Sequence, residues 1–150
     1  MLEKPHCGWS RLTLGDNSWR LSYVNCDLPI EWLLSVTRGL SGNEDFYLWN
    51  DKEGSDLHCN IHDDYCQIYD TLEEKEYIIP VSKIQFCKWL LMDIDNYFGE
   101  WLSWDDNSSW NPDMPRFKSQ EEKDKYYNER REILTFLRNR LAELLNELES

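Results

Sequence analysis

Four short segments with alternating apolar and polar residues constrain the fold of this chain more than any other feature. They span residues 46–50, 56–61, 65–70 and 76–81, and short polar connections separate them. A period of two is typical of strands that bury one face. Because parallel neighbours need long crossovers, such short connections favour an antiparallel meander. In the second segment we expect the side chains of Leu57, Cys59 and Ile61 to face the core. Those of His58 and Asn60 should face solvent.

Residues 9–14 and 19–24 are two further predicted strands, and their connection at 15–18 suits a tight hairpin. A short helix should follow the hairpin. Asp27 can act as its N-cap, Pro29 suits its first turn, and Gly39 suits the position just after its end. We expect about three turns that cover an edge of the sheet.

A capping box predicts the next helix. Ser82 is followed three residues later by Gln85, and apolar residues recur at helical spacing from residue 83 to about residue 102. The opposite side of this helix should face solvent, with Asp93, Asn96 and Glu100.

A second capping box, Ser119 with Glu122, begins a helix that should run to about residue 149, roughly 45 Å at 1.5 Å per residue. Its apolar residues step by sevens and by alternating threes and fours, which is typical of a seam. The seam could pack on a partner helix or on the domain's own sheet. Its members are Tyr127, Leu134, Leu137, Leu141, Leu144 and Leu148.

These patterns predict an α+β fold, with a small antiparallel meander sheet of about four to six strands, two main helices packed on it, and a long C-terminal helix. We expect one domain over residues 1–150, because 150 residues suit a single core. Within it we expect a mixed α+β part at 1–104, a loop of turn-forming residues at 105–118 and the C-terminal helix at 119–150.

The charge of the chain restricts its partners. With 16 Lys and Arg against 29 Asp and Glu the net charge is -13, which disfavours direct binding to nucleic acid or to an anionic membrane surface. Residues 51–110 hold 14 of the acidic and 4 of the basic residues. Because of this negative charge, a charged partner should be a basic protein. The hydrophobic content of 41% argues against disorder in spite of the charge.

Five cysteines at irregular spacing do not resemble a secreted disulfide framework. The sequence also contains neither a signal-like start nor an apolar run long enough to span a membrane. We therefore expect reduced thiols and a cytoplasmic location.

The densest group of metal-competent side chains is His58, Cys59, His62 and Cys66. Their spacing on a strand and a turn does not match the ligand pairs of zinc sites, and buried thiols commonly behave as small hydrophobic residues. Nothing nearby supplies an oxyanion hole, and neither phosphate-binding glycine motif occurs. We expect no metal, no cofactor and no enzymatic activity.

The remaining signal is an acidic surface interleaved with aromatic residues, a combination used at protein interfaces. Two tryptophans lie in a polar, turn-rich stretch, where they either pack back onto the domain or meet a partner. The residues we expect to bind a partner are Asp63, Asp64, Asp93, Glu100, Trp104, Asp105, Asp106 and Trp110.

The leading hypothesis is an inhibitor or immunity-type protein that blocks a basic, nucleic-acid-directed enzyme such as a bacterial nuclease toxin. The general profile is similar to that of bacterial toxin-immunity proteins, although no motif specifies a family. One alternative is a phage or mobile-element protein that mimics nucleic acid to disarm a host nuclease. Another is a structural module that forms a homodimer through the C-terminal helix.

Overall fold

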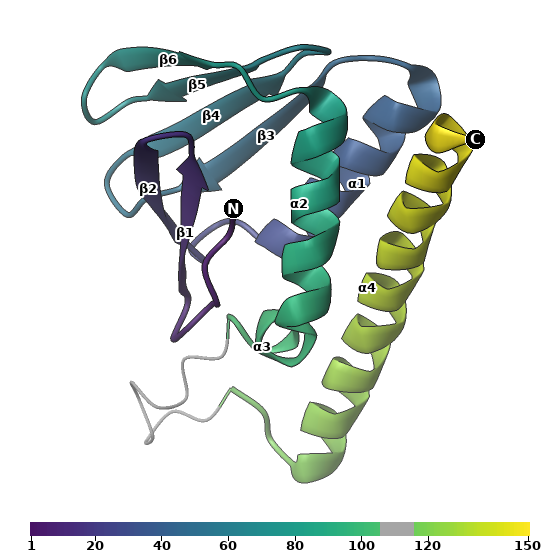
Figure 1. Cartoon of the computed structure of the whole chain (residues 1–150). Coiled ribbons are helices and arrows are strands. Elements are labelled where there is room, and N and C mark those ends of the chain that lie inside the picture. Colours follow the sequence, from purple (N-terminus) through teal and green to yellow (C-terminus); the bar gives the residue numbers. More distant parts are fainter. Residues whose placement is uncertain (106–115) are drawn as a thin grey trace.

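The computed structural model describes residues 1–105 and 116–150 and has the predicted α+β fold (Figure 1). The long C-terminal helix is also confirmed. In chain order the elements are β1 (Trp9–Leu14), β2 (Asn17–Ser22), α1 (Leu28–Gly42), β3 (Phe46–Asp51), β4 (Asp56–Ile61), β5 (Cys66–Asp70), β6 (Lys75–Ile79), α2 (Lys83–Asn96), α3 (Phe98–Leu102) and α4 (Gln120–Glu149).

The strands β3 to β6 form one antiparallel sheet in sequence order, so the predicted meander is confirmed. Alternation along each strand gives the sheet two different faces. The face toward the helices is buried, and β4 contributes Leu57, Cys59 and Ile61 to it as expected. The other face contains no buried residue among the described strand positions.

The strands β1 and β2 form a separate hairpin that lies in front of the sheet, on the same side as α2 (Figure 1). Leu14 pairs with Asn17, so the loop has only two residues, and Gly15 adopts the positive φ of 59° that such a loop requires. The hairpin contacts the sheet through an edge-to-face pair of Trp19 and Tyr77, whose ring centroids are 5.2 Å apart.

The helix α1 covers the edge strand β3, as expected. The indole N–H of Trp32 donates to the backbone carbonyl of Trp49, at 3.3 Å. The helix is longer than predicted, because Asn43 rather than Gly39 takes the left-handed conformation that ends it. Gly39 lies inside the helix, where a Cβ atom would come within 2.6 Å of the Phe46 ring.

The predicted helix from residue 83 to 102 is instead two helices. The Ser82 cap is present, with its hydroxyl accepting from the Gln85 N–H at 3.1 Å, but Tyr97 leaves helical geometry and separates α2 from α3. The prediction that Asp93 faces solvent is wrong. Asp93 is buried, because the N-terminal segment crosses α2 and the Leu2 N–H donates to its carboxylate at 2.7 Å.

The helix α4 packs along α1 and α2 of the same chain. Its seam therefore buries its central leucines inside the domain, which corrects the expectation of a partner helix or the sheet. A buried guanidinium also links α4 to the rest of the domain. Arg130 forms a bidentate ion pair with Asp27 at 2.5 and 2.9 Å and also donates to the carbonyls of Trp101 and Leu102.

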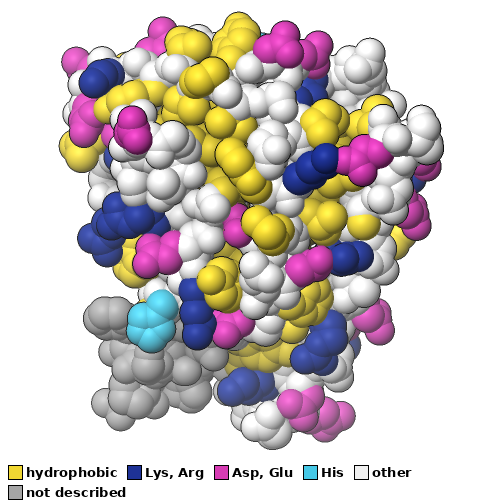
Figure 2. Space-filling model, in the orientation of Figure 1, with side chains coloured by type: hydrophobic (Ala, Val, Ile, Leu, Met, Phe, Trp, Pro, Cys, Tyr) yellow, Lys and Arg dark blue, Asp and Glu magenta, His cyan; other side chains and the backbone are white. Residues whose placement is uncertain are grey.

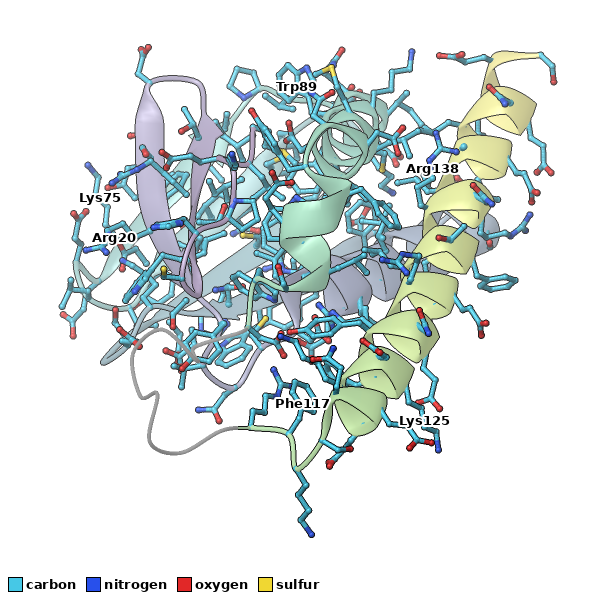
Figure 3. All side chains as sticks on the ribbon, turned by 90° about the horizontal axis from the view of Figure 1, so that it is seen from below. Arg20, Lys75, Trp89, Phe117, Lys125 and Arg138 are labelled. Atoms are coloured by element: carbon cyan, nitrogen blue, oxygen red, sulfur yellow. The ribbon has the colours of Figure 1, made fainter. Side chains whose placement is uncertain are left out.

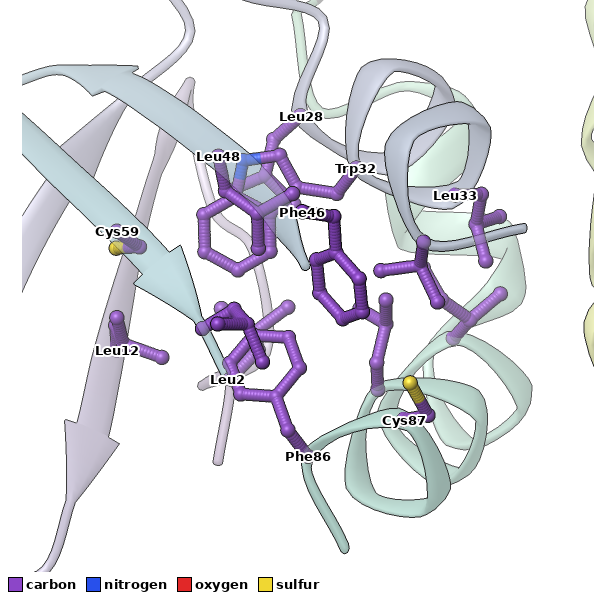
Figure 4. Packing of buried hydrophobic residues seen from close by; sticks show 14 of the residues in the cluster. Leu2, Leu12, Leu28, Trp32, Leu33, Phe46, Leu48, Cys59, Phe86 and Cys87 are labelled. Atoms are coloured by element: carbon purple, nitrogen blue, oxygen red, sulfur yellow. The ribbon is translucent and has the colours of Figure 1, made fainter. Parts of the chain in front are cut away.

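The hydrophobic core lies between the sheet, the hairpin and the helices. The ring of Phe86 from α2 packs against both Trp32 of α1 and Phe46 of β3, with ring centroids 6.2 Å from each (Figure 4). This side of the sheet is thus fully used for folding, and any function of the sheet must come from its other side.

Candidate protein-binding site

The solvent-facing side of the β3–β6 sheet is the main candidate surface, and we call it the exposed sheet face. Its side chains come from alternate positions of the four strands and of the residues that flank them. They are Asp45, Tyr47, Trp49, Asp51, Asp56, His58, Asn60, His62, Tyr65, Gln67, Tyr69, Glu76 and Ile78.

Aromatic side chains form a row across three strands of this face. Tyr47 stacks on His58, with ring centroids 5.8 Å apart and planes at 25°, and its hydroxyl also contacts the His58 Nδ1. His58 in turn lies 6.4 Å from Tyr69. Both tyrosines and Ile78 remain exposed, at 48%, 41% and 60% of their surface. Exposed apolar groups gathered on one face mark interaction surfaces in soluble proteins.

Carboxylates flank the aromatic row. Asp51 of β3 lies directly opposite Asp56 of β4, and Glu76 lies opposite Tyr69 on the other side of the row. In the described part of the chain no Lys or Arg forms an ion pair with any of the three. Like charges at opposed positions destabilise a sheet. Repulsion between the two aspartates therefore destabilises the fold, and a cationic partner would reduce this repulsion.

A hydrogen-bonded polar chain crosses the other end of the face. The Nδ1 of His62 donates to Asp45 at 2.7 Å, and its Nε2 donates to the amide oxygen of Gln67 at 3.2 Å. The amide nitrogen of Gln67 donates to Glu76. Both ring nitrogens of His62 thus lie against oxygen acceptors, and the imidazolium form, which donates from both, suits this arrangement. These bonds raise the pKa of His62 above 6.5 and hold the pKa of Asp45 below 3.8.

Basic residues near the sheet turn away from this face. Lys52 reaches the buried side and pairs with Asp70 at 2.8 Å, and Lys75 lies over the ring of Tyr77, which packs against Trp19 of the hairpin. Lys83 is buried and contacts Asp45 and Asp63 at one edge only. On the face shown in Figure 2, by contrast, basic and acidic side chains are interspersed. The acidic character of the exposed sheet face is therefore a property of that face.

A shallow hollow of about 160 Å³ lies where α1 meets β3, at the border of this face. Glu31, Ser35, Tyr47 and Trp49 line it. It adds a further carboxylate beside the aromatic row and is open to solvent.

Comparisons with known proteins yield no family. No protein-family model matches the chain, and searches of curated proteins and of solved structures gave no significant match.

The residues predicted from the sequence to bind a partner do not form one surface. Asp63 and Asp64 are exposed in the β4–β5 turn, at the border of the exposed sheet face. Glu100 lies in α3 and pairs with Lys4 at 3.5 Å. The length of α2, about 21 Å at 1.5 Å per residue, separates these two positions.

Two further predicted residues, Trp104 and Asp105, follow the end of α3. Asp105 pairs with Arg116 at 3.0 Å and accepts from the Tyr126 hydroxyl at 3.1 Å. Trp104 is buried against Trp101, so its expected role as an exposed anchor is wrong, and Asp93 is likewise buried beneath the N-terminal segment. The remaining two predictions, Asp106 and Trp110, lie outside the described residues.

Several residues of the exposed sheet face were missed, above all Tyr47, Tyr69, Asp51 and Asp56. A signal was present for Tyr47, Asp56 and Tyr69, because alternation in the predicted strands places them on the side opposite the core, whereas Asp51 lies just beyond the strand predicted at 46–50. Charge and composition alone do not distinguish these residues, because only the face that they share brings them together.

The metal-competent residues of β4 separate in the same way. His58 and Cys59 are sequence neighbours on a strand, so one points to solvent and the other to the core. Among the described residues no group of three or more His, Cys, Asp or Glu is placed to hold a metal ion. Burial raises the pKa of Cys66 to about 11 and that of Cys87 to about 12, which keeps these thiols protonated and unreactive.

No described helix is both long and apolar enough to cross a membrane.

Proposed function

We propose that this chain is an acidic inhibitor or immunity-type protein that binds and blocks a basic, nucleic-acid-directed enzyme, such as a bacterial nuclease toxin. The observation that carries the proposal is the exposed sheet face, where aromatic side chains and unpaired carboxylates share one solvent-facing surface without Lys or Arg. Interfaces combine aromatic anchors with complementary charge in this way.

Blocking such an enzyme needs only a complementary surface. Its nucleic-acid site carries Lys and Arg that neutralise phosphates, and a rigid sheet that presents carboxylates can occupy the same positions. The net charge of -13 would also speed encounter with a basic partner, in a salt-dependent way. A phage-encoded mimic of nucleic acid would use the same physics, and its genetic neighbours would distinguish it.

The alternative of a homodimer through the α4 seam has lost its main support. Leu134, Leu141 and Leu144 are buried against elements of the same chain, so the seam offers little free surface. We place the action of the protein in the cytoplasm, since all five cysteines are free thiols and four of them are buried.

The test begins with the intact tagged chain in cells of its source organism. Proteins retained by the wild type are compared with those retained by the double variant Tyr47→Ser/Tyr69→Ser, which removes the exposed aromatic anchors and leaves the charge unchanged. Each protein lost with the variant is purified and assayed for cleavage of fluorescent DNA and RNA, with and without the chain.

We expect a basic nuclease that the wild type inhibits at stoichiometric amounts and the double variant inhibits at least tenfold less well. The control is Ile133→Ser/Phe136→Ser, which removes two exposed apolar side chains from α4. Equal inhibition by the wild type and the Tyr47/Tyr69 variant would contradict the use of this face. Retention of partners with no activity on nucleic acid would contradict the proposed function.

A further inference from the structure

The three carboxylates without a Lys or Arg partner lie close to the aromatic row of the exposed sheet face, one in line with His58 and Tyr69 and two in the neighbouring line of residues. The register places Trp49, His58, Tyr69 and Glu76 in one row across β3 to β6. Asp51 and Asp56 begin the next row, two residues further along each strand. A cationic group resting on the aromatic row would therefore have carboxylates within reach on two sides.

From this arrangement we infer that the exposed sheet face recognises guanidinium groups, so that its partner presents arginine rather than lysine at the interface. The inference rests on the proposed function for the identity of the partner as a basic protein, and it specifies the chemistry of that partner.

Two properties of the guanidinium group fit this face better than an ammonium group does. A guanidinium is planar and binds a carboxylate through two parallel hydrogen bonds, whereas an ammonium acts as a point charge. A guanidinium also stacks on aromatic rings and gives up its hydration water more readily. The face offers both kinds of contact, since Asp51 and Asp56 have no cation and Tyr69 is 41% exposed.

The occupant is further limited by charge. The cations already present, Lys83 and His62, contact Asp45 at one end of the face. Asp51, Asp56 and Glu76 have no Lys or Arg partner among the described residues. An anionic or purely apolar partner would leave these carboxylates desolvated without compensation, which is strongly unfavourable. A partner with several arginines satisfies them.

The experiment uses the full chain and two probes, fluorescein-labelled octa-arginine and octa-lysine, titrated across a salt series. Because a chain of charge -13 attracts any polycation, the ratio of the two affinities is the readout and the strength of binding is not. We expect octa-arginine to bind about tenfold more tightly than octa-lysine at the same salt. Backbone amide shifts induced by octa-arginine should concentrate in β3 to β6.

The variant Asp51→Asn/Asp56→Asn keeps the shapes of both side chains, and we expect it to reduce the preference for arginine to about twofold or less. The matched control, Glu121→Gln/Glu132→Gln, removes the same charge from exposed positions of α4 and should keep the preference. Equal binding of the two peptides by the wild type, or shifts centred on α4, would overturn the inference. So would an equal loss of preference in the control variant.

The outcomes also separate this inference from the proposed function. A chain that prefers octa-arginine through β3 to β6 but inhibits no nuclease contradicts the proposed function alone. A chain that inhibits a nuclease through this face without preferring arginine contradicts the guanidinium inference alone.

Discussion

The buried ion pair between Arg130 and Asp27 makes a quantitative prediction about stability. It joins α4 to the residue before α1, and Arg130 is only 4% exposed. The variant Asp27→Asn removes the negative charge but keeps a residue that is favoured at a helix N-cap. No capping bond from the Asp27 side chain is lost. The change therefore tests the ion pair itself.

Breaking a buried pair by removing one partner costs about 3–5 kcal/mol, because the remaining charge is left uncompensated. The lower end applies here, since the Asp27 side chain is 38% exposed and Arg130 keeps the carbonyls of Trp101 and Leu102 as acceptors. We expect a loss of about 3 kcal/mol. With a urea m-value of about 2 kcal/mol/M, the unfolding midpoint should fall by about 1.5 M.

The chain contains a matched control for this experiment. Arg138 of α4 also forms a bidentate pair with an aspartate, Asp95 of α2, at 2.7 Å for both bonds, but these side chains are 32% and 39% exposed. Figure 3 shows that Arg138 points from α4 toward α2. Exposed pairs contribute less than about 1 kcal/mol, so Asp95→Asn should move the midpoint by less than about 0.5 M. Equal losses for the two variants would refute the assignment of the difference to burial.

Three further outcomes follow from the structure. Gly39→Ala should cost about 1–3 kcal/mol in urea unfolding, because its Cβ meets an aromatic ring, whereas Gly99→Ala meets nothing and should be neutral or stabilising. The pair of His62 and Asp45 should stabilise the fold only between the lowered pKa of the aspartate and the raised pKa of the histidine. The wild type should thus exceed His62→Asn in urea midpoint at about pH 5.5 and lose this advantage as the pH rises through the raised histidine pKa. A thiol reagent should modify Cys7 in the native protein, and the four buried cysteines only after unfolding, which mass spectrometry would detect.

The strands were predictable because their signal is local. Alternation alone placed Leu57 in the core and His58 in solvent, and the short connections fixed the antiparallel order. The helix N-termini at Ser82 and Ser119 were predictable for the same reason, since a hydroxyl and a backbone N–H three residues later form the cap.

The failures came from contacts between distant parts of the chain. Helical periodicity placed Asp93 on the solvent side, but periodicity cannot show that Leu2 crosses that side and donates to the carboxylate. Gly39 has the residue type of a helix end, yet the structure uses its missing Cβ to admit Phe46. In both cases tertiary packing overrides a local preference.

The charge of the middle segment shows why a site could be located only in part from the sequence. The number of Asp and Glu residues predicts an acidic region. Ion pairs with Lys52 and Lys83, however, compensate the charges of Asp70, Asp63 and Asp45. Strand alternation then decides where the remaining carboxylates point. Asp51, Asp56 and Glu76 are left together beside exposed tyrosines, although they come from two separate acidic stretches of the sequence. The surface that a partner meets is therefore set by the charges left unpaired after folding, and the total charge determines only the sign of the partner.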